Sequence, residues 1–425
     1  MGQGQSSAGN QKNEFSETRR RQQASEFFGA VQVGNFKVAK AVLEREPSLL
    51  YETTGCHSSA LHIAAGNGQV EILSMLLERH LNPDVVNRYK QTPFLFAAIY
   101  GKVSCLKKLI DYRVNITMCD TLQGRNCLHY AAYYGRSDCL RVILSAAKTC
   151  PFVNSRHGYS VFVNKADYVG KTPLHIAACR RWPECVRILL DNGALVSAST
   201  GVYGLPGDTP LHLAAREGSL DCVGQLLAWG ADRLQRDASG RTPYEVALKH
   251  YHNACAALLN PSSAEPLVWP ALLKLTSREL DEGAKALLKQ ALMEANRERE
   301  KIILKGFGCS LPSASHSNGS KIDDTIYEAI SDTDVCCICF DKVCTIQVQD
   351  CGHQMCAQCT LALCCHNKPN STIASITHPI CPFCRGTIAQ LVMAPKLKDD
   401  HDADNNTVGT RSSKLRNSSQ GKQQL

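Results

Sequence analysis

The chain has 425 residues, of which 44% are hydrophobic and 20% are charged, and its formal net charge is +8. This length predicts two or three domains, and the composition supports packed cores over most of it. The sequence has no apolar run of about 18 residues and no long basic block, so we expect no transmembrane helix and no nucleic-acid partner. The polar first ten residues also lack the apolar core of a secretory signal, so we expect an intracellular protein.

Residues 1–24 are polar and predict a flexible leader. The leader opens MGQGQS, which matches the N-myristoylation pattern M-G-x-x-x-[ST] with Gly2 as the acceptor. One acyl chain gives only marginal membrane affinity, and the three consecutive arginines Arg19, Arg20 and Arg21 would supply a weak second signal. On this interpretation the protein is cytoplasmic and reaches the plasma membrane through its lipid. The alternative is an ordinary disordered leader.

Internal repeats occupy residues 25–260. The phrases SALHIAAGNG, TPFLFAAIYG, NCLHYAAYYG, TPLHIAACRR, TPLHLAAREG and TPYEVALKHY recur, and their fourth positions are separated by 33, 34, 46, 37 and 33 residues. A period near 33 with T-P-L-H-x-A is typical of ankyrin repeats. A degenerate unit, FFGAVQVGNFKVAKAVLE, precedes the six, so we expect about seven.

Each ankyrin unit is a turn and two antiparallel helices, and it buries its apolar face only against its neighbours. The repeats therefore predict an all-α solenoid with β-hairpin turns and an extended surface that selects a protein partner. Two insertions, 150–163 and 197–207, either contact the partner or are merely tolerated loop length. The histidines of the TPLH phrases are interpreted as turn-forming hydrogen-bond partners. One cysteine per unit is interpreted as a buried packing residue rather than a metal ligand; these are Cys105, Cys139, Cys185, Cys222 and Cys255.

Residues 276–305 predict an amphipathic connecting helix, in which Thr276 and Glu279 fit a capping box. Apolar residues at helical spacing form one stripe. We expect the stripe to pack on the last repeat, with self-association of the helix as the alternative. The stripe consists of Ala284, Leu287, Leu288, Ala291, Leu292 and Ala295.

Residues 306–331 then lack periodicity and predict a flexible linker, and residues 396–425 predict a disordered tail.

Between the linker and the tail, residues 332–390 carry a dense cluster of metal-binding side chains. The chain has 22 cysteines, and 11 of them lie between positions 336 and 384. In a reducing compartment such a cluster indicates metal rather than disulfides. The side chains form four pairs in the order Cys, Cys; Cys, His; Cys, Cys; Cys, Cys, enough for two closed structural zinc sites. The pairs are Cys336 and Cys339, Cys351 and His353, Cys356 and Cys359, and Cys381 and Cys384.

This order and spacing resemble a C3HC4 RING finger, a small α+β domain in which the pairs interleave in a cross-brace. The resemblance implies that Cys336, Cys339, Cys356 and Cys359 hold one Zn²⁺, and that Cys351, His353, Cys381 and Cys384 hold the other. A rival assignment replaces a late ligand with His378 or with the Cys364–Cys365 pair, and it breaks the Cys-Pro-x-Cys pair. The remaining cluster residues, Cys337, Cys344 and His366, then have no ligand role.

RING fingers bind a ubiquitin-conjugating enzyme (E2) loaded with ubiquitin, and the resemblance assigns the contact residues. Ile338 lies inside the first pair and Pro382 inside the last, where E2 contacts are expected. Arg385 follows the last ligand, where RING fingers often carry a cation that bridges E2 and ubiquitin. No nucleophile is expected, because the transfer is accelerated by orientation. The usual tryptophan before the last pair is absent, which affects E2 preference rather than the ligase class.

Ankyrin repeats, a helix ending MEANREREK and a RING phrase beginning CCICFDKVC together resemble the plant ankyrin-repeat RING ubiquitin ligases that bind receptor-like kinases. The resemblance covers residues 25–390. It implies substrate recognition by the repeats, with a receptor-like kinase as one candidate, and ubiquitin transfer and self-ubiquitination through the RING finger. The competing hypothesis is a membrane-tethered ankyrin scaffold whose zinc domain is purely structural.

Overall fold

The computed structural model describes residues 6–151, 153, 158–201, 206–269, 280–306, 335–365 and 379–395. Gly2, nearly all of the predicted linker and the predicted tail 396–425 therefore lie outside the described residues. None of the described helices is both long and apolar enough to cross a bilayer.

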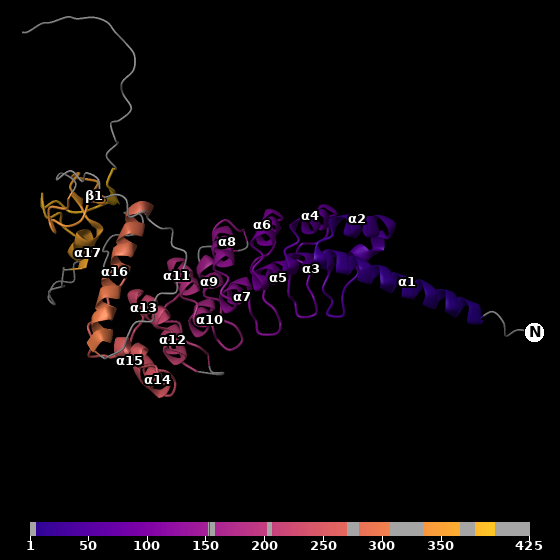
Figure 1. Cartoon of the computed structure of the whole chain (residues 1–425), viewed down its shortest axis with the longest axis horizontal. Coiled ribbons are helices and arrows are strands. Elements are labelled where there is room, and N and C mark those ends of the chain that lie inside the picture. The colour runs from indigo at the N-terminus through magenta and orange to yellow at the C-terminus, as the bar shows by residue number, and fades with distance from the viewer. Residues whose placement is uncertain are drawn as a thin grey trace, which may run out of the picture.

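Seven stacked helix pairs form the solenoid, which confirms the predicted ankyrin architecture (Figure 1). Two short helices, η1 (Pro47–Tyr51) and α9 (Gly158–Val163), lie between pairs, and α9 belongs to the first predicted insertion. The pairs are α1 (Ser6–Val33) with α2 (Phe36–Arg45), α3 (Ala60–Asn67) with α4 (Val70–Glu78), α5 (Pro93–Tyr100) with α6 (Val103–Asp111), α7 (Cys127–Tyr133) with α8 (Ser137–Ala147), α10 (Pro173–Cys179) with α11 (Pro183–Asp191), α12 (Pro210–Glu217) with α13 (Leu220–Ala228), and α14 (Pro243–Lys249) with α15 (Asn253–Leu259).

The TPLH phrase begins the first helix of a unit for local reasons. In α12, Thr209 is the N-cap, its side chain accepts a hydrogen bond from the His212 N–H, and Pro210 occupies the first helical turn. The Nε2 atom of the His212 ring lies 3.0 Å from the Arg241 carbonyl oxygen in the next hairpin turn. The histidine thus ties one repeat to the next, as predicted.

The recurring cysteines lie in the apolar core of the solenoid. All five are at most 1% exposed. Burial raises the pKa of the Cys105 and Cys139 thiols to about 11 and that of the Cys185, Cys222 and Cys255 thiols to about 12. These thiols are neutral at physiological pH, so the prediction that they are small packing residues is confirmed.

The predicted flexible leader is wrong for most of its length, because α1 begins at Ser6. Residues 6–33 contain no proline and many straight-chain Glu, Gln and Arg residues, which favour a helix. Arg20 of this helix lies 2.6 Å from Glu52. One member of the predicted basic membrane signal therefore already faces a carboxylate of the solenoid.

Helix α16 (Glu282–Gly306) lies between the end of the solenoid and the C-terminal segment (Figure 1). It begins later than predicted: the Asp281 carboxylate accepts a hydrogen bond from the Gly283 N–H at 3.2 Å, as an N-cap does. Thr276 and Glu279 of the predicted capping box lie outside the described residues.

The apolar face of α16 packs on both the C-terminal segment and the last repeats, so the prediction that it packs on the repeats is confirmed in part and missed the C-terminal segment. Spacing shows that one helix face is buried but not which element buries it. Ala284, Leu288, Ala291 and Leu292 share a core with the C-terminal segment, whereas Leu304 joins the core of the repeats. Asn296 makes two hydrogen bonds to the Leu267 backbone, of 2.9 and 2.8 Å, which fix the helix to the chain that leaves the last repeat.

The C-terminal segment is a small α+β unit, as predicted. Strands β1 (Ile346–Val348), β2 (Gln354–Met355) and β3 (Leu391–Met393) form an antiparallel sheet in the order β2-β1-β3, and α17 (Ala357–Cys365) packs on α16. Ile346 pairs with Met355 on one side and Met393 on the other. Its side chain is fully buried at the centre of this sheet.

Candidate metal centre

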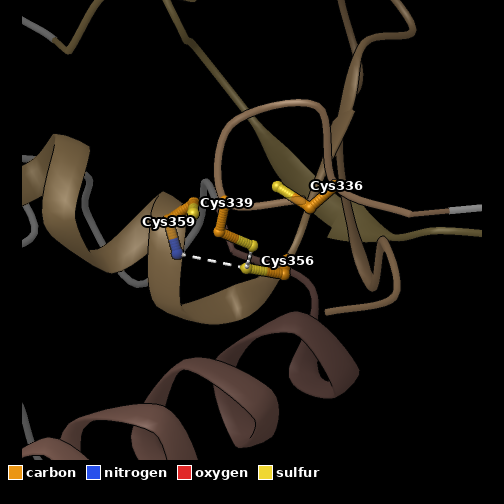
Figure 2. Close-up of side chains that lie close together, drawn as sticks. All are labelled: Cys336, Cys339, Cys356 and Cys359. Atoms are coloured by element: carbon orange, nitrogen blue, oxygen red, sulfur yellow. Dashed lines mark hydrogen bonds between the residues drawn. The ribbon is translucent and has the colours of Figure 1, made fainter. Parts of the chain in front are cut away.

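The structure brings eight cysteine and histidine side chains of the C-terminal segment into two groups. The first group is Cys336, Cys339, Cys356 and Cys359, whose side chains converge between a loop and the start of α17 (Figure 2). The sulfur atoms of Cys339 and Cys356 are 3.8 Å apart. Four sulfur ligands about 2.3 Å from a tetrahedral Zn²⁺ would themselves lie about 3.8 Å apart, so the spacing fits zinc.

The second group is Cys351, His353, Cys381 and Cys384, and the candidate ligand atoms of each group lie within 4.8 Å of one another. The sulfur atoms of Cys351 and Cys381 are again 3.8 Å apart. The Nδ1 atom of His353 is buried and has no hydrogen-bond partner among the described residues. A buried, unpartnered ring nitrogen beside three thiols is the donor that a metal ion would satisfy.

The first and last of the three Cys-x-x-Cys pairs adopt the same turn. The Phe340 N–H donates to the Cys336 carbonyl oxygen at 2.8 Å, and the Arg385 N–H donates to the Cys381 carbonyl oxygen at 2.9 Å. Both residues that follow the pairs have positive φ, 55° for Phe340 and 62° for Arg385. Gly352, at φ 72°, forms the turn that presents Cys351 and His353. These turns aim neighbouring ligands at one point.

Backbone N–H groups and neighbouring thiols act on the cysteine pKa values in opposite directions. Burial raises the pKa of Cys336, but hydrogen bonds from the backbone of Cys356, Cys339 and Ile338 outweigh it and lower that pKa to about 6. Burial and the adjacent thiols raise the pKa of Cys359, because nearby thiolates repel. A doubly charged cation removes that repulsion, so the group suits a metal.

The interleaved grouping is the one that the RING resemblance implies, and the rival assignment gains no support. Cys364 is 6% exposed and packs in the apolar core shared with α16, and neither group includes it. His366 and His378 lie outside the described residues, as does the side chain of Cys365. Cys337 is exposed, and burial raises the pKa of Cys344 to about 11. Metal ligation by the eight residues, and Zn²⁺ as the metal, remain predictions.

The predicted E2 contacts lie on the surface around the two groups. Ile338 is 39% exposed although it sits between two ligand positions, and Pro382 and Arg385 are exposed. The face that α16 covers is a different one: Gln358 of α17 donates to Glu294 of α16 at 3.0 Å. The connecting helix therefore leaves Ile338 open to a partner.

Two aromatic residues of this surface were missed by the sequence analysis. Phe340 is 79% exposed, and the Phe383 ring stacks on His353 with centroids 5.2 Å apart. Phe340 follows its Cys-x-x-Cys pair in the same position as Arg385. That equivalence is visible in the sequence and would have identified Phe340 as a surface residue.

The fold and the two groups define a class of protein, an ankyrin-repeat solenoid joined by a helix to a cross-braced RING finger. Residues 335–390 match the family model of the E3 ubiquitin-protein ligase XB3/XBAT31 RING finger, and overlapping matches to the ankyrin-repeat model cover residues 27–268. XBAT31 of Arabidopsis thaliana is 62% identical over 86% of this chain and 79% of its own length. The E3 ubiquitin-protein ligase XB3 of Oryza sativa subsp. japonica is 56% identical over 87% of this chain and 82% of its own length.

The chain belongs to the family of plant ankyrin-repeat RING E3 ubiquitin ligases that includes XB3 and XBAT31. Among solved structures, the human ASB11 ankyrin repeat domain is 23% identical, with a TM-score of 0.46, and the match covers 56% of this chain and 99% of that one.

Proposed function

We propose that the RING surface binds a ubiquitin-loaded E2 and promotes transfer of ubiquitin to lysines of a substrate protein. The observation that carries this proposal is Ile338, an aliphatic side chain held 39% exposed between the ligand positions Cys336 and Cys339. Removing aliphatic surface from water is favourable, so the exposure of Ile338 suits a partner that covers it.

The eight ligand residues would hold two Zn²⁺ ions, which supply structural rigidity to the loops and, with four protein ligands each, leave no position for water. The RING finger would therefore accelerate transfer by orienting the thioester that links ubiquitin to the E2. No covalent ubiquitin intermediate forms on this chain. Pro382 is a second E2 contact on the loop of the last pair. Arg385 is exposed at a fixed backbone turn, from which its guanidinium can reach both E2 and ubiquitin carbonyl oxygens.

We propose that the ankyrin repeats select the substrate and that the chain also ubiquitinates itself. Solenoids offer an extended surface rather than a pocket, which suits recognition of a protein. A receptor-like kinase is the candidate substrate that the family resemblance implies. Helix α16 packs on both the repeats and the RING finger, so a bound substrate would be held at a set place relative to the E2.

We further propose that Gly2, which lies outside the described residues, is myristoylated and brings the cytoplasmic protein to the plasma membrane. The support is the sequence motif MGQGQS. Membrane fractionation of a Gly2→Ala variant tests this proposal. An unchanged distribution between membrane and cytosol would exclude myristoylation of Gly2 as the membrane signal.

The test of the ligase function is self-ubiquitination with purified full-length protein, ubiquitin, E1 and a panel of E2 enzymes. Ile338→Ala is expected to abolish the ubiquitin chains while the zinc content stays at two ions per chain. Ile302→Ala is the matched control, because Ile302 is 71% exposed on α16, away from the RING loops. Activity that survives Ile338→Ala with zinc intact would show that the E2 surface is misplaced. The scaffold alternative predicts no chains with any E2.

A further inference from the structure

Helices α5, α7 and α10 are neighbours in the middle of the solenoid (Figure 1). Aromatic and basic side chains occupy the turns where these helices lead into their partner helices. We call this set of side chains the aromatic-basic ridge and define it by Tyr100, Tyr134, Arg136, Arg180 and Trp182. Tyr100 is 53% exposed, and Tyr134 and Trp182 are each 42% exposed. Both arginines are exposed as well.

The side chains of the ridge interlock from one repeat to the next over glycines. Arg136 lies over Gly101, where an added Cβ would be 2.9 Å from the Arg136 Cδ. The Trp182 indole lies over Gly135, where an added Cβ would be 2.6 Å from the ring. Both glycines have positive φ, 73° and 66°, so the turns favour the residue without a side chain and leave room for the neighbour.

Further contacts fix the ridge around Tyr133, at the end of α7. The Arg180 guanidinium carbon lies 4.2 Å from the centre of the Tyr133 ring, a cation–π contact. The Trp182 Nε1–H donates to the Tyr133 carbonyl oxygen at 3.3 Å. Trp182 and Arg180 are therefore held in place before any partner binds, which lowers the entropy cost of binding.

The sequence stretches that form the ridge carry only positive charge, and the nearest carboxylates, Glu217 and Asp221, belong to the next repeat. The stretches FAAIYGK (96–102), YAAYYGR (130–136) and CRRWP (179–183) contain four Lys and Arg residues and no Asp or Glu. None of these four cations forms an ion pair with a residue that the structure describes. The first acidic residues beyond two of the stretches, Asp138 and Glu184, both contact Arg141 instead.

We propose that the aromatic-basic ridge binds an extended acidic segment of the substrate protein, in which apolar or aromatic side chains alternate with Asp and Glu. Exposed Trp, Tyr and Arg side chains are the residues that dominate binding energy in protein interfaces. Unpaired cations beside them favour an acidic partner and repel a basic one. Four cations without a longer basic track are too few for a nucleic-acid surface. This inference rests on the proposed role of the repeats in substrate selection.

The test is selection from a phage-displayed library of random 16-residue peptides on the full-length protein, followed by affinity measurement with the selected peptides. The expected peptides are acidic and contain aromatic or large aliphatic residues. Arg136→Gln combined with Arg180→Gln is expected to weaken their binding about tenfold or more. Lys107→Gln, a loss of charge at an exposed residue of α6, is the matched control and is expected to leave binding unchanged.

Trp182→Phe provides a second variant that keeps an aromatic ring over Gly135, and it is expected to weaken binding less than Trp182→Ala. Thermal unfolding shows whether each variant stays folded. Neutral or basic selected peptides, equal binding by the double arginine variant, or stronger binding to single-stranded oligouridine would overturn the ridge proposal. Ubiquitin discharge onto free lysine, which needs only the RING finger, should be unchanged in the ridge variants. A failure of that discharge in the wild-type protein would count against the ligase function and leave the ridge result standing.

Discussion

Acidification should destabilise the solenoid through its buried histidines. His62, His129 and His175 are 0% exposed, and burial, partly offset by hydrogen bonds to backbone carbonyls, lowers the pKa of each to about 4 from 6.5. Well above pH 6.5, as at pH 7.5, both the folded and the unfolded chain keep these rings neutral, so this contribution to stability is complete. As the pH falls from 6.5 towards 4, the unfolded chain binds protons that the folded chain excludes, and stability is lost.

The size of this effect follows from the two pKa values of each ring. At pH 5 an unfolded histidine is almost fully protonated and the folded one is almost fully neutral, which costs about 2 kcal/mol per ring and about 6 kcal/mol for the three. The measurement is urea unfolding followed by circular dichroism at pH 7.5, 6.5, 5.5 and 5.0.

The matched variant is His175→Leu, because Leu95 occupies the same position of another repeat in this chain. The variant loses the hydrogen bond to the Asp208 carbonyl oxygen, so it should be less stable at pH 7.5. Its loss of stability between pH 7.5 and 5.0 should be smaller than that of the wild type by about 2 kcal/mol. An equal loss in both proteins would refute the assignment of the acid sensitivity to the buried rings.

Three further predictions concern the RING finger. Removal of metal with a chelator should make the segment 335–395 sensitive to protease while the repeats resist, because metal binding supplies much of the folding free energy of so small a domain; equal sensitivity of both would contradict this. Leu288→Ala should destabilise the packing of the RING finger on α16 by about 2–5 kcal/mol, as seen in thermal unfolding, since Leu288 is 0% exposed, whereas Ile302→Ala should have little effect. Arg385→Gly keeps the positive φ and removes the cation, so ubiquitin discharge should fall about tenfold at constant zinc content; an unchanged rate would exclude Arg385 from the transfer.

The parts of the molecule that sequence reasoning predicted are those specified by local signals. A repeat near 33 residues fixes the solenoid because each unit forms its own helices and turn, and the Cys-x-x-Cys spacing is satisfied within one turn. The grouping of the eight residues into two candidate metal sites could also be predicted, but only through the family resemblance. Spacing alone does not show that Cys351 lies beside Cys381, because the two are 30 residues apart in the chain.

The partner of α16 could not be predicted in the same way. The stripe through Leu288 and Leu292 shows that a face is buried, and two apolar surfaces, the last repeat and the RING finger, were available to bury it. The choice depends on long-range packing, such as the contact of Gln358 with Glu294, which has no signature in either segment. The ridge likewise appears only when Trp182 is seen to lie over Gly135 of the preceding repeat.

Single-turnover discharge of ubiquitin from a loaded E2 onto free lysine tests the central claim most directly, because it needs neither a substrate nor chain formation. Full-length protein with two zinc ions should accelerate the discharge, and Ile338→Ala with the same zinc content should not. A wild-type protein that binds two zinc ions and leaves the discharge rate unchanged with every E2 in a broad panel would contradict the account and favour a structural zinc domain.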